Sequence, residues 1–245
     1  WRAFTIDAAA VHEAGGTDGL ELAVFTATLA DALRRHGADA HDRLAAQFAT
    51  GPDAHLNIVK LRAARRLGAS VAGAFGIQTP DLPIHAVTSL RMMQSQDAWT
   101  NMLRTTSAGF GAVIGGADYL TLRPFTDTPE DRRLGGATPA GHRIARNQQL
   151  LMMEESHLGQ VRDVAYGSYF HERLTEELAQ EAWRVFQTIE SEGGMAAFRD
   201  SGALEAAIAE DVNVREARGE PVLGVTLHPS DDGPAPEVRM TEVRS

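Results

Sequence analysis

Strand-like and helix-like segments alternate four times within residues 1–160, and this alternation constrains the fold more than any other feature of the chain. The expected strands are 4-FTIDA-8, 44-LAAQFATG-51, 84-IHAVTSL-90 and 119-YLTLRPF-125. Segments with helically spaced apolar residues follow them, at 20–36, 56–76, 97–114 and 143–157. Four successive βα units imply a parallel sheet with right-handed crossovers, in a doubly wound fold or in part of a barrel.

The rest of the chain has a different pattern. Residues 163–170 are expected to form a loop or turn, and 175–194 an amphipathic helix that packs outside the sheet. A last helix near 203–218 and a short apolar segment at 222–227 follow. The polar, proline-containing residues from His228 onward are typical of a linker or a frayed end.

Charge and composition exclude several classes of function. The chain has 33 acidic and 23 basic residues, and its net charge of −10 argues against binding to a nucleic-acid backbone. No apolar run approaches the roughly 20 residues that a membrane span requires, and no signal-peptide pattern is present. We therefore expect a cytoplasmic location without a membrane partner. The absence of cysteine excludes disulfides and thiolate chemistry. Because the chain begins at Trp1, next to a strand, we expect it to be cut from a longer protein.

Few side chains suggest a site by their spacing. Of the nine histidines, only His36 and His41 come within five positions of each other, and no cluster has metal-ligand spacing, so we expect no metal site. Asn147, Leu151 and Glu155 are each four residues apart on one helix and share a face. That face could offer an amide and a carboxylate to the hydroxyl groups of a ligand, or it could be an ordinary solvated stripe.

The motifs of the second half resemble a known family. Their residues are 143-RIARNQQLLMMEESH-157, 167-GSY-169, 190-ESEGGM-195 and, elsewhere, 60-KLRAAR-65, 88-TS-89, 115-GG-116 and 222-VLGV-225. In this order they resemble the adenosylcobalamin-dependent methylmalonyl-CoA mutase family, over residues from about 3 to 226. The resemblance implies the C-terminal half, strands 5–8, of a TIM (β/α)8 barrel plus a helical extension. Residues 1–160 would be the partial TIM-barrel substrate domain, 161–227 the helical extension and 228–245 a linker or tail.

The resemblance also bears on catalysis. Active members of the family carry a Tyr-His pair before a Glu-Ala-Gly turn, and alignment on 13-EAG-15 places Ala9 and Ala10 at those positions. Val87 likewise stands where active members have a glutamine. We therefore expect no catalytic residues in this chain. Asn147 and Glu155 carry over as candidate cofactor-binding residues, because the helix that contains them lies near the adenosyl group in active relatives.

Three hypotheses about function follow from this resemblance. The first is a non-catalytic protein, similar to the mutase small subunit, that pairs with a catalytic large subunit. The assembled enzyme would use adenosylcobalamin, and this chain alone would bind none. The second is an active mutase component whose missing barrel half and cobalamin domain come from another segment or chain. The third is a homodimer in which two four-stranded halves close one barrel.

Overall fold

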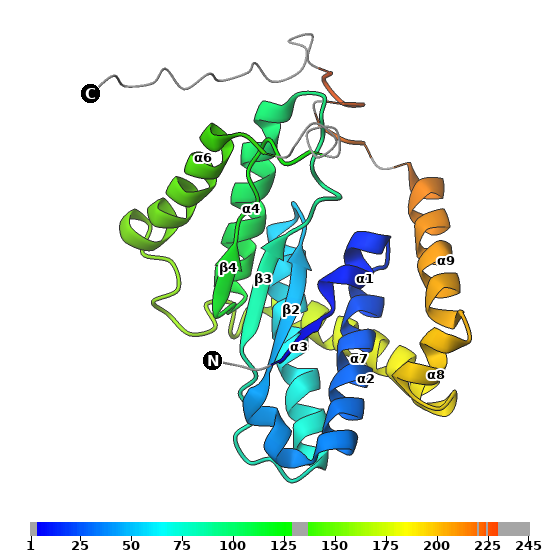
Figure 1. Ribbon diagram of the computed structural model, residues 1–245. Helices are drawn as coiled ribbons and strands as arrows, with labels where there is room; N and C mark the ends of the chain where they lie inside the picture. Colours follow the sequence, from blue (N-terminus) through cyan, green and yellow to red (C-terminus); the bar gives the residue numbers. More distant parts are fainter. Residues whose placement is uncertain (1–3, 129–136, 220, 224, 230–245) are drawn as a thin grey trace.

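A four-stranded parallel sheet forms the centre of the molecule, as the alternating pattern predicts (Figure 1). The computed structural model describes residues 4–128, 137–219, 221–223 and 225–229. The strands lie in the sheet in chain order, and every neighbouring pair is parallel. Their bounds are β1 Phe4–Asp7, β2 Leu44–Thr50, β3 Ile84–Thr88 and β4 Tyr119–Thr121.

Helices connect and flank these strands. The helices of the βα units are α1 Ala9–Ala14, α2 Asp18–His36, α3 Ala54–Ala74, α4 Asn101–Ile114 and α6 Pro139–Leu150. The extension contains α7 Tyr169–Ser191, α8 Met195–Asp200 and α9 Ala203–Arg218. Two short 3-10 helices, η1 Ala38–Arg43 and η2 Ala98–Thr100, and a π-helical turn, η3 Leu151–Glu155, complete the described elements. None of the helices in the described part of the chain is both long and apolar enough to cross a membrane.

The strand order determines where the helices lie. When parallel strands follow one another in chain order, right-handed crossovers carry each connecting helix to the same face of the sheet. Ala46 and Phe48 of β2 are accordingly buried in the main core, whereas Thr5 and Asp7 of β1 are exposed on the opposite face. The sheet thus has one covered face, one open face and two edges, β1 and β4.

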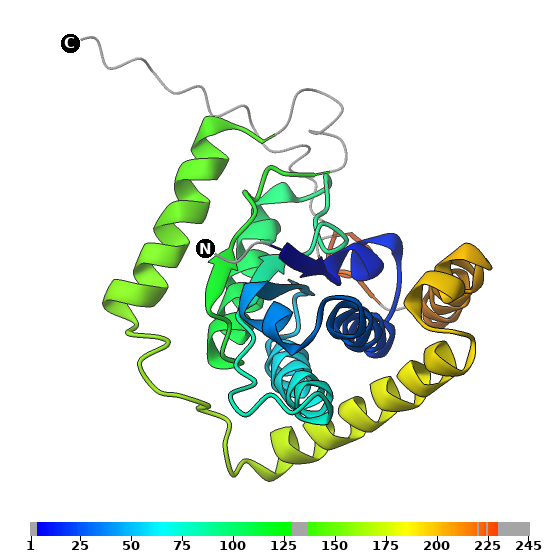
Figure 2. The same ribbon diagram turned by 60° about the horizontal axis from the view of Figure 1, so that its bottom comes forward.

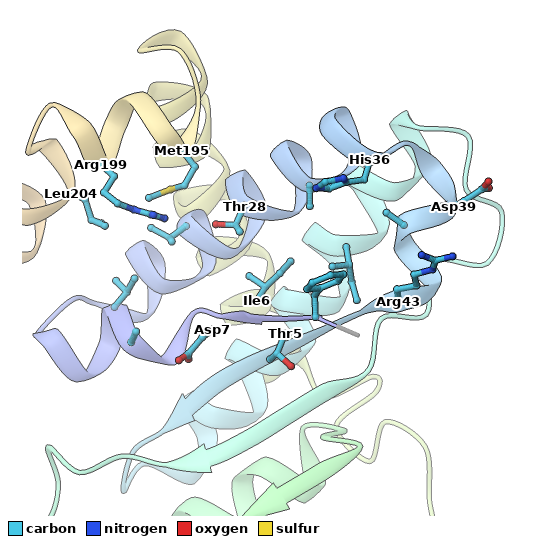
Figure 3. A pocket seen from close by; sticks show the side chains of 17 residues that line it. Thr5, Ile6, Asp7, Thr28, His36, Asp39, Arg43, Met195, Arg199 and Leu204 are labelled. Carbon is cyan, nitrogen blue, oxygen red and sulfur yellow. The ribbon is translucent and has the colours of Figure 1, made fainter. Parts of the chain in front are cut away.

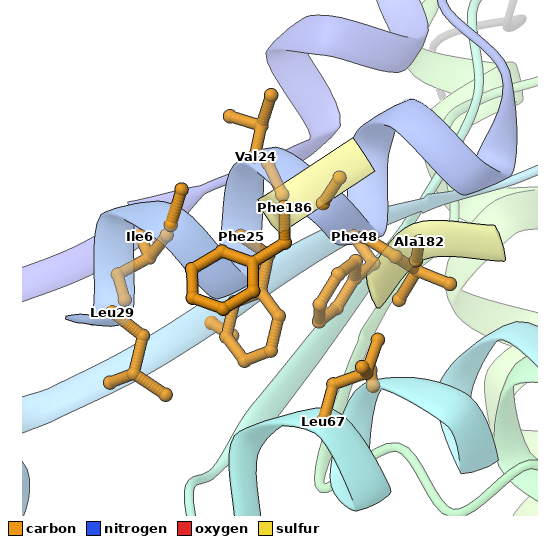
Figure 4. Packing of buried hydrophobic residues seen from close by; sticks show 14 of the residues in the cluster. Ile6, Val24, Phe25, Leu29, Phe48, Leu67, Ala182 and Phe186 are labelled. Carbon is orange, nitrogen blue, oxygen red and sulfur yellow. The ribbon is translucent and has the colours of Figure 1, made fainter. Parts of the chain in front are cut away.

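The main core lies between the covered face and the helices (Figure 4). Phe25 of α2 and Phe48 of β2 pack edge to face, with ring centroids 5.1 Å apart. Gly68 of α3 lies against the ring of Phe25, so a larger residue there would press on it. Burial of these aromatic side chains supplies a large part of the driving force for folding.

The first helix of the extension packs onto this core. Ala182, Phe186 and Ile189 of α7 belong to the same buried cluster as the sheet, and α7 runs past α3 and α2 (Figure 2). Arg62 of α3 fixes the start of α7, because its guanidinium donates to Glu172 at 2.6 Å and to Asp163 at 2.9 Å. The expectation that this amphipathic helix covers the outside of the α/β unit agrees with these contacts.

The segment after β1 forms a helix. Directly after the strand the chain enters the short helix α1, because alanine and glutamate favour helical backbone. The helix ends at Gly15, whose φ of 123° is readily adopted by glycine and is costly for other residues. Ala9 and Ala10 therefore lie in the first turn of α1 rather than in β1.

Several other boundaries also differ. β4 ends at Thr121 rather than near residue 125, because the backbone N–H of Arg123 donates to the Thr88 hydroxyl and Pro124 has no N–H to donate. The helix expected at 143–157 begins earlier, at Pro139, and continues into the π-helical turn η3. The helix expected at 175–194 begins six residues earlier, at Tyr169. Residues 230–245 of the expected tail lie outside the described residues.

Candidate functional site

The carboxyl ends of β1, β2 and β3 are the first place to look for a site, because parallel α/β folds bind their ligands at this end. Ala9 is buried there and packs with Ala49 and Val87 in a small apolar cluster. Ala10, one residue on, is exposed and lines a groove on the other side of β1. Ala9 and Ala10, the two positions expected for the Tyr-His pair, thus lie in different surroundings. The side chain of each is only a methyl group.

The loops above this cluster are tied to one another. Arg91 donates to the carbonyl oxygens of His12 and Gly16, at 2.6 and 3.0 Å. The carboxylate of Glu13 accepts from the backbone N–H of Leu90 at 2.9 Å. His12 Nε2 lies 3.1 Å from the Ser89 hydroxyl. These polar groups therefore hold α1 against the loop after β3.

A buried charge network lies beneath the same loops. The ammonium of Lys60 is fully buried and donates to Asp18 Oδ1 and Glu21 Oε2, both at 2.8 Å. Glu21 is also fully buried, and its second oxygen accepts from the backbone N–H of Ala49 at 2.8 Å. His12 Nδ1 lies 3.6 Å from Asp18 and 3.7 Å from Glu21. The network links α1, α2 and α3 to β2.

The charges of the network shift the pKa values of its members. Burial alone would raise the pKa of Asp18, but Lys60 and His12 outweigh it and hold that pKa well below its usual range. Burial alone would lower the pKa of Lys60, but the two carboxylates outweigh it and raise that pKa. Burial raises the pKa of Glu21, an effect that Lys60 opposes. Lys60 is therefore held as a cation with both carboxylates as its partners.

His12, Asp18 and Glu21 also form a group close enough to hold a metal ion, since their ligand atoms lie within 4.8 Å of one another. Sequence spacing gives no sign of this group, because its members come from two helices. The ammonium of Lys60 already bonds to both carboxylates, so it occupies the position that a cation would take. We therefore interpret the cluster as an ion-pair network.

The two residues that the resemblance assigns to cofactor binding lie elsewhere. Asn147 is exposed on α6, and Glu155 is exposed at the end of η3. The neighbouring Gln148 points inward instead, and its amide donates to the carbonyl oxygen of Met102 at 3.0 Å. Asn147 and Glu155 thus face outward at the β4 edge of the sheet, away from Ala9 and Ala10.

The open face of the sheet carries polar groups in pairs. Gln47 donates to Asp7 at 3.0 Å across β2 and β1, and His85 Nε2 lies 2.8 Å from the Thr121 hydroxyl across β3 and β4. Burial lowers the pKa of His85, and Asp7 opposes that shift. A face with this composition is suited to contact with water or with another polar surface rather than to an apolar core.

A groove of about 880 Å³ runs along the outer side of β1 (Figure 3). Its apolar lining comes from β1, α2, α8 and α9, and includes Ile6, Met195 and Leu204. His36 and Arg43 line one end of the groove, whereas Arg199 of α8 lines the other (Figure 3). Because the groove runs along the edge strand, it could accommodate another segment of polypeptide as well as a small molecule.

Sequence reasoning missed the charge network, although one signal was present. Lys60 lies on the apolar stripe of its helix, where an unpaired charge would be costly and a buried partner is therefore expected. The identity of its partners could not be inferred, because Asp18 and Glu21 lie 42 and 39 positions away. A histidine pair was missed for the same reason, since His55 and His171 lie 3.0 Å apart across 116 positions.

Comparison with known proteins agrees with the motifs. A family model described as methylmalonyl-CoA mutase matches residues 1–239. The chain is 42% identical to the methylmalonyl-CoA mutase small subunit of Streptomyces virginiae, covering 93% of this chain and 38% of that protein. It is 39% identical to the probable small subunit of Mycobacterium tuberculosis H37Rv, covering 96% of this chain and 40% of that protein.

A protein named as a mutase, without a subunit designation, is also similar. The methylmalonyl-CoA mutase of Escherichia coli K12 is 36% identical over 177 residues, which cover 71% of this chain and 24% of that protein. The chain spans about two fifths of the length of the small subunits that it matches. The family model and these identities agree over nearly the whole sequence, and the chain belongs to the methylmalonyl-CoA mutase family.

Proposed function

We propose that this chain is a non-catalytic, small-subunit-like component that pairs with a catalytic, adenosylcobalamin-dependent acyl-CoA mutase subunit. The carboxyl end of the sheet carries this proposal, because Ala9 and Ala10, the positions that the resemblance assigns to the Tyr-His pair of active members, bear only methyl groups. A mutase has to hold its acyl thioester with fixed polar groups. Polar groups of α1, α2 and α3 are instead bonded to one another or to the loop after β3.

We further propose that the four strands are the fifth to eighth of a TIM barrel, with residues 161–227 as a helical extension. The sequential order of the described strands and the single covered face of their sheet support this arrangement. The coverage of about two fifths of the related small subunits also supports it. The remaining strands would come from another segment or from another chain.

Within the described residues, the two candidate cofactor-binding side chains lie apart from the groove. Asn147 and Glu155 are exposed on an outer helix, and neither lines the groove beside β1. Adenosylcobalamin supplies radical chemistry when it is bound to the assembled enzyme. In our proposal the catalytic subunit holds it, and Asn147 and Glu155 at most contact it from the edge of the sheet.

The proposal is tested by reconstitution. The catalytic large subunit of a methylmalonyl-CoA mutase is mixed with this chain, and native mass spectrometry and turnover with adenosylcobalamin are measured. We expect a complex of the two chains, with turnover that requires the large subunit. Isomerisation of methylmalonyl-CoA by this chain and the cofactor alone would contradict the proposal. Acyl-CoA binding that disappears in Glu155→Ala would instead favour an active mutase component.

A further inference from the structure

We propose that His55 and His171 form a binding site for one divalent transition-metal ion, such as Zn²⁺, which joins the start of α3 to the start of α7. Neither histidine lines the groove beside β1, and neither is a residue that the resemblance assigns to catalysis or cofactor binding. The metal site is therefore independent of the mutase role proposed above. Three features of the pair support it, namely the separation of the rings, the contacts that orient them and the charges around them.

The separation of the two rings is the first of these features. Nδ1 of His55 and Nε2 of His171 lie 3.0 Å apart, although 116 positions separate the two residues in the chain. Zn²⁺ binds imidazole nitrogen at about 2.0–2.1 Å, so two neighbouring ligands of one ion lie about 2.8–3.4 Å apart. Because Nε2 of His55 can carry the proton instead of Nδ1, an ion can replace this hydrogen bond once the rings turn both lone pairs toward it.

Neighbouring groups hold the ring of His171 in the orientation that a metal ligand needs. Nδ1 of His171 lies 2.9 Å from the Ser168 hydroxyl. When Nδ1 donates its proton to this hydroxyl, the lone pair of His171 is on Nε2, the atom that faces His55. Metal-ligating histidines nearly always hold their second ring nitrogen in such a hydrogen bond. Phe170 packs edge to face with both imidazoles, with ring centroids 5.7 Å from His55 and 5.3 Å from His171.

The backbone also places the pair well. His55 is exposed in the first turn of α3, and His171 is partly exposed in the first turn of α7. Arg62 ties the same two elements together, because it donates to Glu172 of α7. The two nitrogens are thus held close to each other by the fold, and water can reach them to fill the remaining coordination positions of an ion.

The charges around the pair favour a cation. Arg62 is paired with both Asp163 and Glu172, so these three groups carry a net charge of −1 beside His171. Asp53, the N-cap of α3, adds a carboxylate two residues before His55. These carboxylates offset the positive ends of the α3 and α7 dipoles, which by themselves would oppose a cation.

The ligand atoms determine which ions fit. Imidazole nitrogen suits Zn²⁺, Ni²⁺ and Cu²⁺, whereas Mg²⁺ and Ca²⁺ prefer oxygen ligands. The chain has no cysteine thiolate to compete for the ion. The carboxylates of Asp18 and Glu21 are already occupied by the ammonium of Lys60. The histidine pair is therefore the preferred position for a transition-metal ion in the described part of the chain.

Calorimetric titration of chelator-treated protein with Zn²⁺ tests the site. We expect one Zn²⁺ per chain, and no corresponding heat with Mg²⁺. His171→Ala should raise the dissociation constant about tenfold or more, and so should His55→Gln, which keeps a hydrogen-bonding side chain but removes the imidazole. The matched control is His142→Ala, at an exposed histidine of α6, which should leave the affinity unchanged. Equal affinity in the unmodified chain and His171→Ala would overturn the proposal, as would a folded chain that does not bind Zn²⁺.

Thermal unfolding gives a second readout, because an ion that joins α3 to α7 binds the folded state. At a Zn²⁺ concentration about 100 times the dissociation constant, the unfolding midpoint should rise by about 5–10 °C. Circular dichroism without the ion establishes that His55→Gln and His171→Ala are folded, and both variants should lose this rise. A rise of the same size in either variant would show that the ion binds elsewhere, against the proposal.

Discussion

Individual side chains stabilise this molecule through burial of charge as well as of apolar surface. Lys60 lies on the apolar stripe of α3, as the spacing of the sequence indicates, yet its ammonium is satisfied by Asp18 and Glu21. The position of the lysine could be predicted from the sequence. Its partners could not, because the ion pairs join residues that are distant in the chain and meet only after α2 and α3 have packed.

Loss of the buried ammonium should strongly destabilise the fold. Lys60→Met leaves the buried carboxylate of Glu21 and the partly buried carboxylate of Asp18 without their counter-ion, and we expect the free energy of unfolding to fall by about 3–5 kcal/mol. Urea denaturation measures this change. The matched control is Arg66→Met on the same helix, whose exposed ion pair with Glu176 should contribute less than about 1 kcal/mol. Equal losses in the two variants would contradict the role of burial.

The same network should make stability depend on pH in the acid range. The pKa of Asp18 is lowered in the folded state, so its contribution is complete above the unfolded-state pKa of about 3.9 and is lost as the pH falls below it. We expect the difference in unfolding free energy between the unmodified chain and Asp18→Asn to be constant from pH 7 to about 5 and to shrink below about 4. A difference that grows on acidification would show that Asp18 is not held as a carboxylate.

At the scale of elements, the fold depends on close approach between helices. The helices α3 and α4 pack against each other beside the sheet. The sequence does not predict how closely they approach. A β-carbon at Gly111 of α4 would lie 2.6 Å from the carbonyl oxygen of Ala54, at the start of α3.

Two glycine substitutions should therefore have opposite effects. Gly111→Ala forces α3 and α4 apart, and we expect a loss of about 1–3 kcal/mol in unfolding free energy. Gly73→Ala, in α3, meets no atom within 4 Å and should gain up to about 1 kcal/mol from better helix propensity. Thermal denaturation of both variants measures the contrast. Stabilisation by Gly111→Ala would mean that the two helices do not pack this closely.

At the scale of the whole molecule, the extension is bound to the sheet by a shared core. The fold class, the four βα units and the family could be predicted from the sequence, because the spacing of apolar residues and the short motifs can be recognised without knowledge of the tertiary structure. The short helix α1 and the early start of α7 could not, because tertiary packing decides where a helix begins and ends. We expect the residues proposed as a separate extension, 161–227, to unfold together with residues 1–160.

Cooperativity can be measured with a single tryptophan. In a variant that keeps only Trp183, fluorescence from α7 and circular dichroism of the whole chain should give coincident urea transitions. Ile189→Ala, at a fully buried residue of α7, should lower the unfolding free energy by about 2–5 kcal/mol. Val214→Ala, at an exposed residue of α9, should change it by less than about 0.5 kcal/mol. Separate transitions would mean that α7 and the sheet are independent units.

The sequence by itself determined the parallel α/β class, the order of the elements and the family. Each of these can be recognised from residues that are close in the chain or from short sequence motifs. The tertiary structure decided which distant charges meet around Lys60, that Ala9 and Ala10 face different surroundings, and that a groove follows the free edge of β1. These features depend on how helices from different βα units pack. They cannot be inferred from a single sequence, because contacts between residues that are tens of positions apart produce no regular sequence pattern.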